Sequence, residues 1–519
     1  MCFAAAVCGA CGGSHAAPPP EDARWWRGKT AYEVYVRSFA DSNGDGIGDL
    51  RGLTAKLDVL NDGDPATTTD LGVDAIWLMP ISPSPSDHGY DVTDHRGVNP
   101  QYGTLEDFDT LVREAHRRGI KVLLDLVLNH TSDRHPWFVN AQVAPAGLYR
   151  DWYVWSSTDP RWHKPWDPAD PWVPWNGSFY YALFCPCMPD LNYRNPAVEQ
   201  EMTDVMRLWL SRGADGFRLD GARYYVESPQ GDVADQPETH ALLRRLHAAF
   251  PKALLVGEVW TNENTVASYG NGDELQLAFS FDLAGSITSS LRAGDATELI
   301  NTLAVSERVL TVDRNFEAPF LSNHDQERVF RALKGDVPSM RLAAATLFAM
   351  PGTPFIYYGE ELGMRGGSWR DDSAKRTAYR FSPDAPAYGF GTAPPRIAAD
   401  ELPGVDLASQ QKDPASLWNL YRSLIALRHA RAALATGDAT RPEVTGGGPG
   451  IVAVLRRAGA SSVLFVANYA SVAAAPFSVA VTGSPSELLS SGLSSSPSPA
   501  AGQLSFPALP PRSYAFYSL

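Results

Sequence analysis

The segment Val122-Leu-Leu-Asp-Leu-Val-Leu128 decides the fold, because apolar side chains occupy all but one of its positions. A continuous apolar run indicates a strand that is covered on both faces, as in a parallel sheet with helices on each side. The chain contains eight short apolar segments that we predict to be strands, at 31–36, 75–79, 122–128, 216–219, 254–256, 279–281, 320–321 and 355–358.

The segments between these strands have helical patterns. In the clearest case Thr104 and Asp107 form a capping-box pattern, Phe108 and Leu111 fall on one apolar face, and Gly119 ends the helix. Strands that alternate with helices predict a parallel sheet joined by crossover helices. Eight such repeats predict an α/β fold, specifically a (β/α)8 TIM barrel.

Two parts of the chain do not fit this repeat. The stretch 131–195 is far longer than an ordinary loop, so we expect an inserted subdomain after the third strand. Beyond a helix at 416–433, strands separated by Gly, Pro and Ser turns predict a C-terminal all-β domain. The expected organisation is a leader and linker at 1–23, the barrel at 24–130 and 196–435, the inserted B subdomain at 131–195, and a C-terminal β-sandwich at 436–519.

The composition is that of a compact acidic protein. The 519 residues include 44 Lys and Arg against 59 Asp and Glu, a formal net charge of −15, and 44% are hydrophobic. Without a stripe of Lys and Arg the chain lacks the positive field that nucleic acid or an anionic membrane would need, so we expect a neutral or cationic ligand. We separately expect a monomer. Trp residues cluster between Trp137 and Trp175, which favours stacking platforms for a ligand, although many of them could simply hold the insertion together.

The N-terminus looks like a short export segment. The run Val7-Cys-Gly-Ala-Cys11 resembles the lipobox of bacterial lipoproteins, in which Cys11 would carry the lipid, and a chance match or a misassigned start codon is the alternative. We therefore expect an extracytoplasmic protein, secreted, periplasmic or lipid-anchored, with membrane contact only through Cys11. Cys185 and Cys187 are too close for an ordinary bridge and too few for a zinc site, and the sequence leaves open whether they are bonded.

Polar side chains gather where the predicted strands end, which is the face of such a barrel that carries catalytic groups. They are Arg37, Asn129, His130, Arg218, Asp220, Glu258, Asn323, His324 and Asp325. Several carboxylates beside Arg, His and aromatic residues are the equipment of glycoside chemistry, in which one carboxylate attacks and one acid protonates the leaving oxygen. Repulsion among close carboxylates raises one pKa, and Arg218 beside Asp220 favours an ionised nucleophile. Any one of these acids taken alone could be a solvated loop residue.

Four segments resemble, in order, the signature regions of the α-amylase superfamily, glycoside hydrolase family 13. They are Asp125-Leu-Val-Leu-Asn-His130, Gly216-Phe-Arg-Leu-Asp220, Gly257-Glu-Val-Trp260 and Phe320-Leu-Ser-Asn-His-Asp325. Three further segments are similar to the family, Gly72-Val-Asp-Ala-Ile-Trp-Leu-Met-Pro80, Met188-Pro-Asp-Leu-Asn192 and Gly352-Thr-Pro-Phe-Ile-Tyr-Tyr-Gly-Glu-Glu361. The resemblance extends from about Trp25 to the C-terminus.

The resemblance implies a role for each matching residue. Asp220 would be the nucleophile, Glu258 the acid/base and Asp325 the stabiliser of the transition state. Arg218 would orient Asp220. The residues implied to bind substrate are Asp87, His88, Tyr90, Asp91, His130, Arg218, Arg223 and His324, with Tyr90 stacking on the sugar and the two His of the signatures hydrogen-bonding it.

A loop after the first strand carries oxygen ligands at alternate positions. Asp41, Asn43, Asp45, Asp49 and the Ile47 carbonyl match the calcium loop of oligo-1,6-glucosidase-like members, with glycines that permit a tight wrap. We expect structural calcium there, or alternatively magnesium, and an acidic turn without metal is the other interpretation. Tyr224 replaces the His that usually closes the second signature, which argues against a second calcium near Asn129.

We therefore predict a retaining α-amylase that hydrolyses α-1,4-glucosidic bonds of starch, maltodextrins or related α-glucans. The segment 188–192 is intermediate between oligo-1,6-glucosidases and neopullulanases, as in a group of bacterial α-amylases. Asp87 instead favours an exo-acting enzyme, because exo-acting α-glucosidases have an Asp at the matching position that caps the terminal glucose. An exo-acting α-glucosidase or oligo-1,6-glucosidase, a transglycosidase and a non-catalytic barrel protein therefore remain as alternatives.

Overall fold

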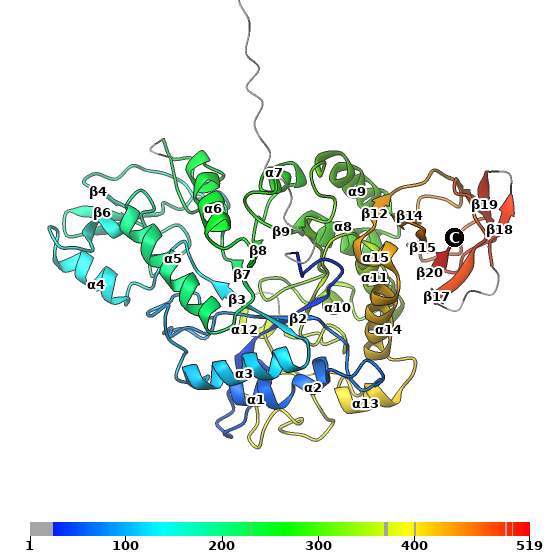
Figure 1. The fold of residues 1–519 in the computed structure, drawn as a ribbon, viewed down its shortest axis with the longest axis horizontal. Helices are drawn as coiled ribbons and strands as arrows, with labels where there is room; N and C mark the ends of the chain where they lie inside the picture. The colour runs from blue at the N-terminus through cyan, green and yellow to red at the C-terminus, as the bar shows by residue number, and fades with distance from the viewer. Residues whose placement is uncertain are drawn as a thin grey trace, which may run out of the picture.

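The computed structural model describes residues 24–228, 230–367, 372–398, 401–491, 493, 496–500 and 502–519. Its central sheet has eight parallel strands in the order β10-β9-β8-β7-β3-β2-β1-β11 (Figure 1). Phe355 N donates to Pro319 O (2.8 Å) just beyond β10, where the two outer strands meet. The (β/α)8 barrel is thus confirmed. Its strands are β1 (Ala31–Val34), β2 (Ala75–Leu78), β3 (Lys121–Leu126), β7 (Gly216–Leu219), β8 (Leu254–Gly257), β9 (Leu277–Phe279), β10 (Glu317–Ala318) and β11 (Phe355–Tyr357).

Two strands lie earlier in the chain than predicted. The sixth covers Leu277–Phe279 instead of 279–281, and the seventh covers Glu317–Ala318 instead of 320–321. Phe281 and Phe320 caused the error, because they are buried against each other just past the strand ends, with ring centroids 5.0 Å apart. Hydrophobicity alone does not distinguish a strand residue from one that packs over the end of a strand.

Helices surround the barrel, and α3 (Leu105–Arg117) begins as predicted. Thr104 Oγ1 accepts from Asp107 N (3.2 Å) while Asp107 Oδ2 accepts from Thr104 N (2.9 Å), which completes the capping box. The other helices outside the insertion are η2 (Val36–Ser38), α1 (Leu50–Ala55), α2 (Leu57–Leu60), α5 (Pro196–Ser211), α6 (Pro237–Ala249), α7 (Glu263–Ser268), α8 (Phe281–Ala293), α9 (Thr297–Val309), α10 (Val329–Ala332), α11 (Val337–Ala349), α12 (Asp372–Lys375), α13 (Leu407–Lys412), α14 (Leu417–Ala430) and α15 (Ala432–Thr436).

The segment between β3 and α5 extends from one side of the barrel (Figure 1). It contains α4 (Pro136–Val143), η3 (Arg150–Trp152) and a small sheet of β4 (Trp155–Ser156), β6 (Ser178–Tyr181) and β5 (Trp172–Trp175). Cys185 and Cys187 follow this sheet and form a disulfide, which their spacing did not favour. A turn in which Met188 N donates to Cys185 O (2.8 Å) brings their Cα atoms to 5.1 Å.

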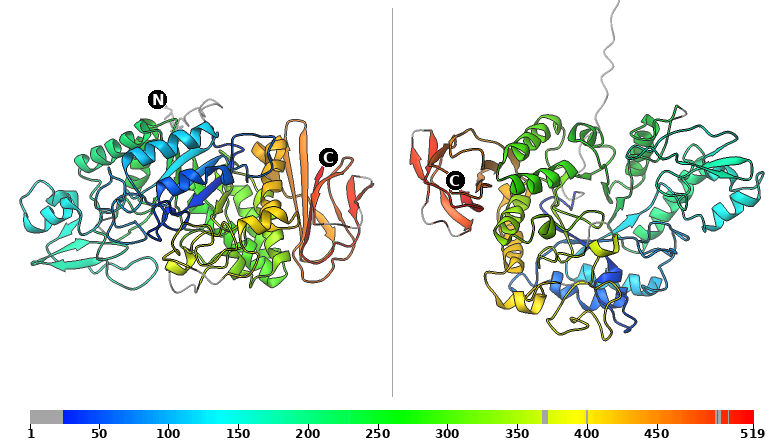
Figure 2. Two further views of the ribbon diagram at one scale, coloured as in Figure 1. Left: turned by 90° about the horizontal axis from the view of Figure 1, so that it is seen from below. Right: turned by 180° about the vertical axis from the view of Figure 1, so that it is seen from behind.

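Two antiparallel sheets form the C-terminal all-β part, at the opposite end of the molecule from the insertion (Figure 2). One sheet has the order β12-β14-β15-β20-β17 and the other β13-β16-β19-β18, with an apolar cluster that includes Leu464, Phe477 and Phe506. The strands are β12 (Asp438–Thr440), β13 (Val444–Gly446), β14 (Ile451–Ala458), β15 (Ser461–Asn468), β16 (Phe477–Val479), β17 (Ser486–Ser490), β18 (Ser498–Ala500), β19 (Gln503–Phe506) and β20 (Ser513–Ser518).

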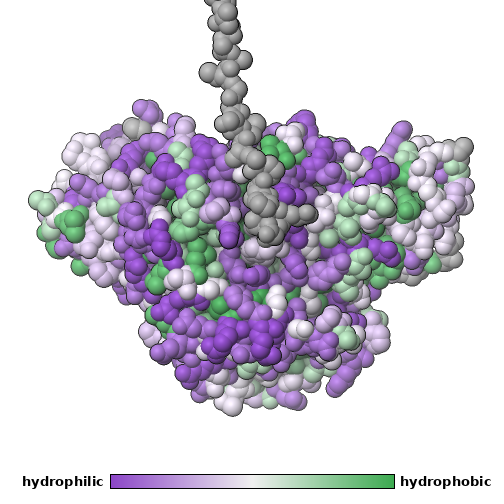
Figure 3. Space-filling view, in the orientation of Figure 1, coloured by the Kyte–Doolittle hydropathy of each residue, from purple (hydrophilic) through white to green (hydrophobic). Residues whose placement is uncertain are grey.

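Hydrophilic residues dominate the face of the molecule shown in Figure 3, with hydrophobic residues in small groups. Within the described part of the chain, every helix is too short or too polar to cross a membrane. The predicted leader at 1–23, including Cys11, lies outside the described residues.

Candidate active site

Three carboxylates project from the ends of barrel strands into one cavity of about 710 Å³. Asp220 directly follows β7, Glu258 directly follows β8, and Asp325 comes from the loop after β10. The structure therefore brings together the three acids that the sequence singled out. The cavity is lined by His88, Tyr90, His130, Pro165, Trp166, Phe184, Met188, Asp220, Arg223, Tyr224, Glu258, Trp260, Asp325, Asp372 and Arg376.

Arg218 contacts two of these three acids, Asp220 and Glu258. Its side chain, 1% exposed, places Nη1 2.7 Å from Asp220 Oδ1 and Nη2 3.0 Å from Glu258 Oε2. Nη1 also donates to Asp125 Oδ1 (2.8 Å), whose carboxylate lies on β3 inside the barrel. A buried guanidinium needs this compensation, because an unpaired buried charge is very costly. Arg218 thus contacts Asp220 as predicted, and it contacts Glu258 as well.

The three acids have different proton affinities. Burial raises the pKa of Asp220 to about 6, although the positive charge of Arg218 opposes the shift. Burial also raises the pKa of Glu258, again against Arg218. Burial acts on Asp325 in the same direction, but His324 and Arg376 outweigh it and hold the pKa of this carboxyl well below its usual range. From the sequence we expected Arg218 to lower the pKa of Asp220, but burial raises this pKa by more than Arg218 lowers it.

His324 lies between two carboxylates. Its Nδ1 is 2.6 Å from Glu33 Oε1 on β1, and its Nε2 is 3.1 Å from Asp325 Oδ2. Burial favours the neutral ring, but Asp325 and Glu33 raise the pKa of His324 to about 10, so the imidazole is charged at neutral pH. A charged ring beside Asp325 explains why that carboxyl stays ionised.

Two aromatic rings of the motif His88-Gly-Tyr90 form one wall of the cavity. The ring of Tyr90 stacks on His324 with centroids 5.5 Å apart, and His88 stacks on the other side of Tyr90 at 6.0 Å. His130 is buried on the same wall with Nε2 3.2 Å from Tyr90 O, and burial lowers its pKa to about 3. A neutral His130 is suited to hydrogen bonding with a sugar hydroxyl.

The structure does not place Asp87 or Asp91 in the lining of the cavity. Asp87 is exposed, and its backbone carbonyl accepts from the Tyr35 hydroxyl (2.5 Å). Asp91 is buried and accepts from Ser84 Oγ (2.5 Å) and from Ser86 Oγ. Asp91 therefore stabilises the loop that carries Tyr90.

Arg223 does line the cavity, and the protein itself fixes its guanidinium. Nε donates to Asp235 Oδ1 (2.9 Å) and Nη1 donates to the backbone oxygen of Trp260 (2.9 Å). Trp260, 48% exposed, stacks on Phe281 with centroids 4.4 Å apart. Seven Trp lie in the cluster between Trp137 and Trp175, and of these only Trp166 belongs to the cavity lining. Trp137, Trp152, Trp162 and Trp172 pack against other rings of the insertion.

Sequence reasoning missed Arg376. Its Nη2 lies 2.9 Å from Asp325 Oδ1, and its Nε donates to the backbone oxygen of His324 (3.1 Å). Arg376 follows α12, far along the chain from the strand that leads to Asp325, so no local motif pairs the two. Glu33 and Asp125 were missed as well, although each lies within a segment that we had assigned to a strand.

In the loop 41–49 the side-chain oxygens of the predicted metal ligands accept hydrogen bonds from backbone amides. Asp41 Oδ1 accepts from Asn43 N (2.9 Å), Asn43 Oδ1 from Asp45 N (2.9 Å), and Asp45 Oδ1 from Ile47 N (2.8 Å). Asp49 accepts from Gly52 N (2.7 Å) as the N-cap of α1. In the described residues, no set of three or more Asp, Glu, His and Cys side chains converges as a metal site would. The predicted ligands of the loop are all oxygen donors, which a hard cation prefers. The acids among them, however, do not converge on one point.

The side chain of Asn129 is buried after β3, and its Oδ1, the atom that could coordinate a metal, has no hydrogen-bond partner among the described residues. Its Nδ2 donates to Asp190 Oδ2 (2.7 Å), which links the barrel to the insertion. The absence of a second calcium near Asn129 stays a prediction.

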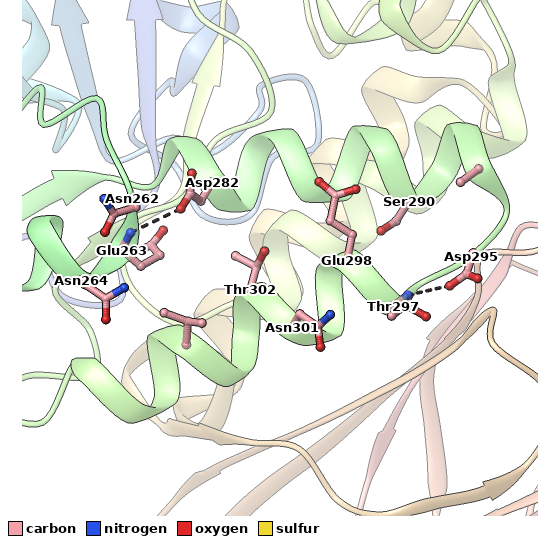
Figure 4. Close-up of a pocket in the computed structure, with 12 residues that line it drawn as sticks. Asn262, Glu263, Asn264, Asp282, Ser290, Asp295, Thr297, Glu298, Asn301 and Thr302 are labelled. Atoms are coloured by element: carbon pink, nitrogen blue, oxygen red, sulfur yellow. Dashed lines mark hydrogen bonds between the residues drawn. The ribbon is translucent and has the colours of Figure 1, made fainter. Parts of the chain in front are cut away.

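A second cavity, of about 640 Å³, lies between α7, α8 and α9 (Figure 4). Its polar side chains already serve the local backbone in part, since Asp282 Oδ2 accepts from Glu263 N (3.3 Å) and Asp295 Oδ1 from Thr297 N (2.8 Å). Of the described residues that line it, none is aromatic and none belongs to the predicted site. The first cavity is therefore the one equipped for glycoside chemistry.

Comparison with known proteins agrees with this geometry. Residues 33–437 match the family model described as alpha amylase, catalytic domain. The chain is 40% identical over 423 residues to alpha-amylase 3 of Dictyoglomus thermophilum, with 80% of each chain covered, and 36% identical over 500 residues to the trehalose synthase/amylase TreS of Mycolicibacterium smegmatis, with 85% of this chain and 82% of the relative covered. The crystal structure of alpha-amylase from H. orenii superposes with a TM-score of 0.82 at 37% identity, covering 94% of this chain and 99% of that one. The chain belongs to the α-amylase family, glycoside hydrolase family 13, and is an enzyme of its glycosidase and transglycosidase type.

Proposed function

We propose that this enzyme hydrolyses α-1,4-glucosidic bonds of starch, maltodextrins and related α-glucans with retention of configuration. The observation that carries the proposal is that one guanidinium, Arg218, contacts both Asp220 (2.7 Å) and Glu258 (3.0 Å) at the floor of the cavity. Sharing one guanidinium keeps the two carboxyl groups close, as in retaining enzymes, where they are about 5 to 5.5 Å apart.

The different pKa values fit two displacements. Glu258, with its raised pKa, donates its proton to the glycosidic oxygen while Asp220 attacks the anomeric carbon, so the C1–O bond breaks as a glucosyl–Asp220 bond forms. Glu258 then accepts a proton from water, whose oxygen attacks the anomeric carbon and releases Asp220. Asp325, whose pKa is held low, remains negative and stabilises the positive charge that develops on the sugar.

The test combines variants with product analysis on maltoheptaose. Glu258→Gln should lower kcat about 10² to 10⁴-fold with little change in affinity, because it removes proton transfer but not binding. Glu327→Gln is the control, since Glu327 pairs with Arg331 outside the cavity. Proton NMR of the first products should show the α anomer. Release of the β anomer, or full activity of Glu258→Gln, contradicts the proposal.

Transglycosylation is the second candidate, because one relative is named a trehalose synthase/amylase. Incubation with maltose distinguishes the two reactions: hydrolysis gives glucose alone, whereas an intramolecular transfer gives trehalose. Glucose released only from chain ends of maltoheptaose, or from isomaltose, indicates the exo-acting α-glucosidase or oligo-1,6-glucosidase alternative instead.

We also propose that the loop 41–49 binds structural Ca²⁺, or Mg²⁺ less tightly, through Asp41, Asn43, Asp45, Asp49 and the Ile47 carbonyl. All of these ligands are oxygen donors, which hard cations prefer. Saturating Ca²⁺ at about 100 times Kd should stabilise the protein by about 2.7 kcal/mol relative to EDTA, measured as a rise in Tm. Asp45→Ala should abolish the rise and exposed Asp64→Ala should not. Equal Tm values in EDTA and Ca²⁺ contradict the proposal.

We infer an extracytoplasmic location for the enzyme, as a monomer with Cys11 as its lipid anchor. The disulfide between Cys185 and Cys187 supports an oxidising compartment. Membrane fractionation of bacteria that express the full chain should find it in the membrane fraction, and Cys11→Ser should release it. A soluble protein in both cases contradicts the anchor.

A further inference from the structure

The disulfide Cys185–Cys187 lies between two residues of the active-site cavity, Phe184 and Met188. We propose that this bridge is a positioning element that holds the Phe184 wall in place beside the nucleophile and so sets the affinity for the glucan chain. The inference rests on the proposed glucan hydrolysis, because Phe184 is treated as part of a substrate-binding wall.

Phe184 packs directly on the peptide that follows the nucleophile. A Cβ atom added to Gly221 would lie 3.1 Å from Phe184 Cζ, so the ring would have to move by a few tenths of an ångström to make room for it. The amide of Gly221 donates to Glu258 Oε2 (2.9 Å). The Phe184 ring therefore borders the cavity directly beside the catalytic acids.

The same ring supports the rest of an aromatic wall. Trp166, 48% exposed, stacks on Phe184 with centroids 5.5 Å apart, and the edge of Tyr224 meets Phe184 at 5.7 Å. His130 contacts Phe184 at 5.4 Å. An exposed indole stacked on a fixed ring offers a flat apolar surface of the kind on which sugar rings bind.

Two hydrogen bonds to neighbouring segments and the disulfide together hold the turn at 185–188. Tyr180 Oη donates to Pro186 O (2.8 Å), and Asp133 N donates to Cys187 O (2.8 Å). The loop that the bridge closes is very short, so it restrains the unfolded chain less than a 15-residue loop, which contributes about 3 kcal/mol. The bridge is therefore expected to act on the local geometry of the wall more than on global stability.

The experiment compares oxidised and reduced enzyme on maltoheptaose. A phosphine cleaves the Sγ–Sγ bond: phosphine, disulfide and water give phosphine oxide and two thiols. We expect KM to rise about fivefold with kcat within about twofold, because binding is lost in the ground and transition states alike. The double variant Cys185→Ser/Cys187→Ser should have the same high KM with and without the phosphine. Cys11→Ser, which leaves the Cys185–Cys187 bridge intact, should respond to the phosphine like the unmodified chain.

Two further measurements make each outcome decisive. Tm and far-UV circular dichroism of the double variant should be nearly unchanged; a fall of kcat and Tm at unchanged KM assigns a purely structural role and overturns the proposal. An unchanged KM after reduction, verified by thiol titration, also overturns it. Maltoheptaose binding to Glu258→Gln, measured by calorimetry with and without phosphine, needs no turnover. An enzyme without glucan activity whose binding still responds to phosphine would refute the proposed hydrolysis but not the positioning role.

Discussion

Arg218 is the residue on which the electrostatics of the site depend. It is buried at 1% exposure and contacts Asp125, Asp220 and Glu258 at 3.0 Å or less. One positive charge among three buried carboxyl groups cannot keep all of them ionised near neutral pH, which is why one can retain a proton. Asp325 stays ionised, because His324 and Arg376 place additional positive charge beside it.

This arrangement predicts a bell-shaped pH profile. Below pH about 6 Asp220 becomes protonated and can no longer attack, so kcat/KM should fall as pH drops through that value. At high pH the profile should fall again as Glu258 loses its proton. Initial rates on maltoheptaose from pH 4 to about 10 measure both limbs, which belong to the coupled pair of acids.

A variant tests the cause of the acidic limb. Burial is the main cause of the raised pKa of Asp220, and the charge of Asp125 raises it further, so Asp125→Asn should move the acidic limb to lower pH. Asp94→Asn, at an exposed position, is the control and should leave the limb in place. A limb that stays unchanged in Asp125→Asn would contradict this account of the pKa.

Asp87 gives a second prediction at this scale. The exposed side chain lies outside the cavity lining, so Asp87→Asn should keep kcat/KM for maltoheptaose within about twofold of the unmodified enzyme. Asp325→Asn is the contrast, with an expected loss of about 10² or more because the negative charge that stabilises the developing positive charge on the sugar is removed. A switch from terminal glucose release to internal cleavage in Asp87→Asn would instead support the chain-end role that the sequence suggested.

Among the elements, α3 shows how local sequence fixes a helix of the barrel. The reciprocal hydrogen bonds of Thr104 and Asp107 satisfy two donors at its first turn. Thr104→Ala should therefore lower the free energy of unfolding by about 1 kcal/mol, measured in urea.

Thr110→Ala is the matched control for this helix. Thr110 lies in the middle of α3, where Ala is the better helix former, so its replacement should be neutral or stabilising. Equal losses at both positions would mean that the capping box contributes nothing specific. Hydrogen exchange of the first-turn amides locates the effect.

The whole molecule depends on the junction of the barrel with the C-terminal sheets. Arg456 of β14 is fully buried there, and its Nη1 donates to Ala349 O (2.9 Å) and Met350 O (2.6 Å). Its Nη2 donates to Leu434 O (3.2 Å) and Gly437 O (2.7 Å). One side chain thus joins the end of α11, the α15 helix and the first C-terminal strands.

Arg456→Leu should destabilise the protein strongly, because each buried carbonyl left without a donor costs about 1 to 3 kcal/mol. The neighbouring Arg457→Leu is the control, since Arg457 is exposed on the same strand and its loss should cost little. Thermal and urea unfolding measure both. A loss in Arg456→Leu no larger than in Arg457→Leu would show that the junction is held by apolar packing alone.

Sequence patterns were sufficient to predict the barrel, the C-terminal sheets and the meeting of Asp220, Glu258 and Asp325. The reason is physical: strands covered on both faces need continuous apolar runs, and parallel strands bring their carboxyl ends to one rim. Residues that directly follow these apolar segments must therefore lie near one another at that rim. The same argument was least precise at β9 and β10, where buried Phe281 and Phe320 lie beyond the strands.

Only the tertiary structure shows which residues pair with each acid and so set its charge. His324 binds Glu33 across 291 positions of the chain, and Arg376 binds Asp325 across 51. It also decided that Asp87 lies outside the cavity lining and that Cys185 bonds to Cys187. Apolar periodicity and short motifs describe neighbours along the chain, whereas pKa values and side-chain positions depend on groups that only folding brings within a few ångströms.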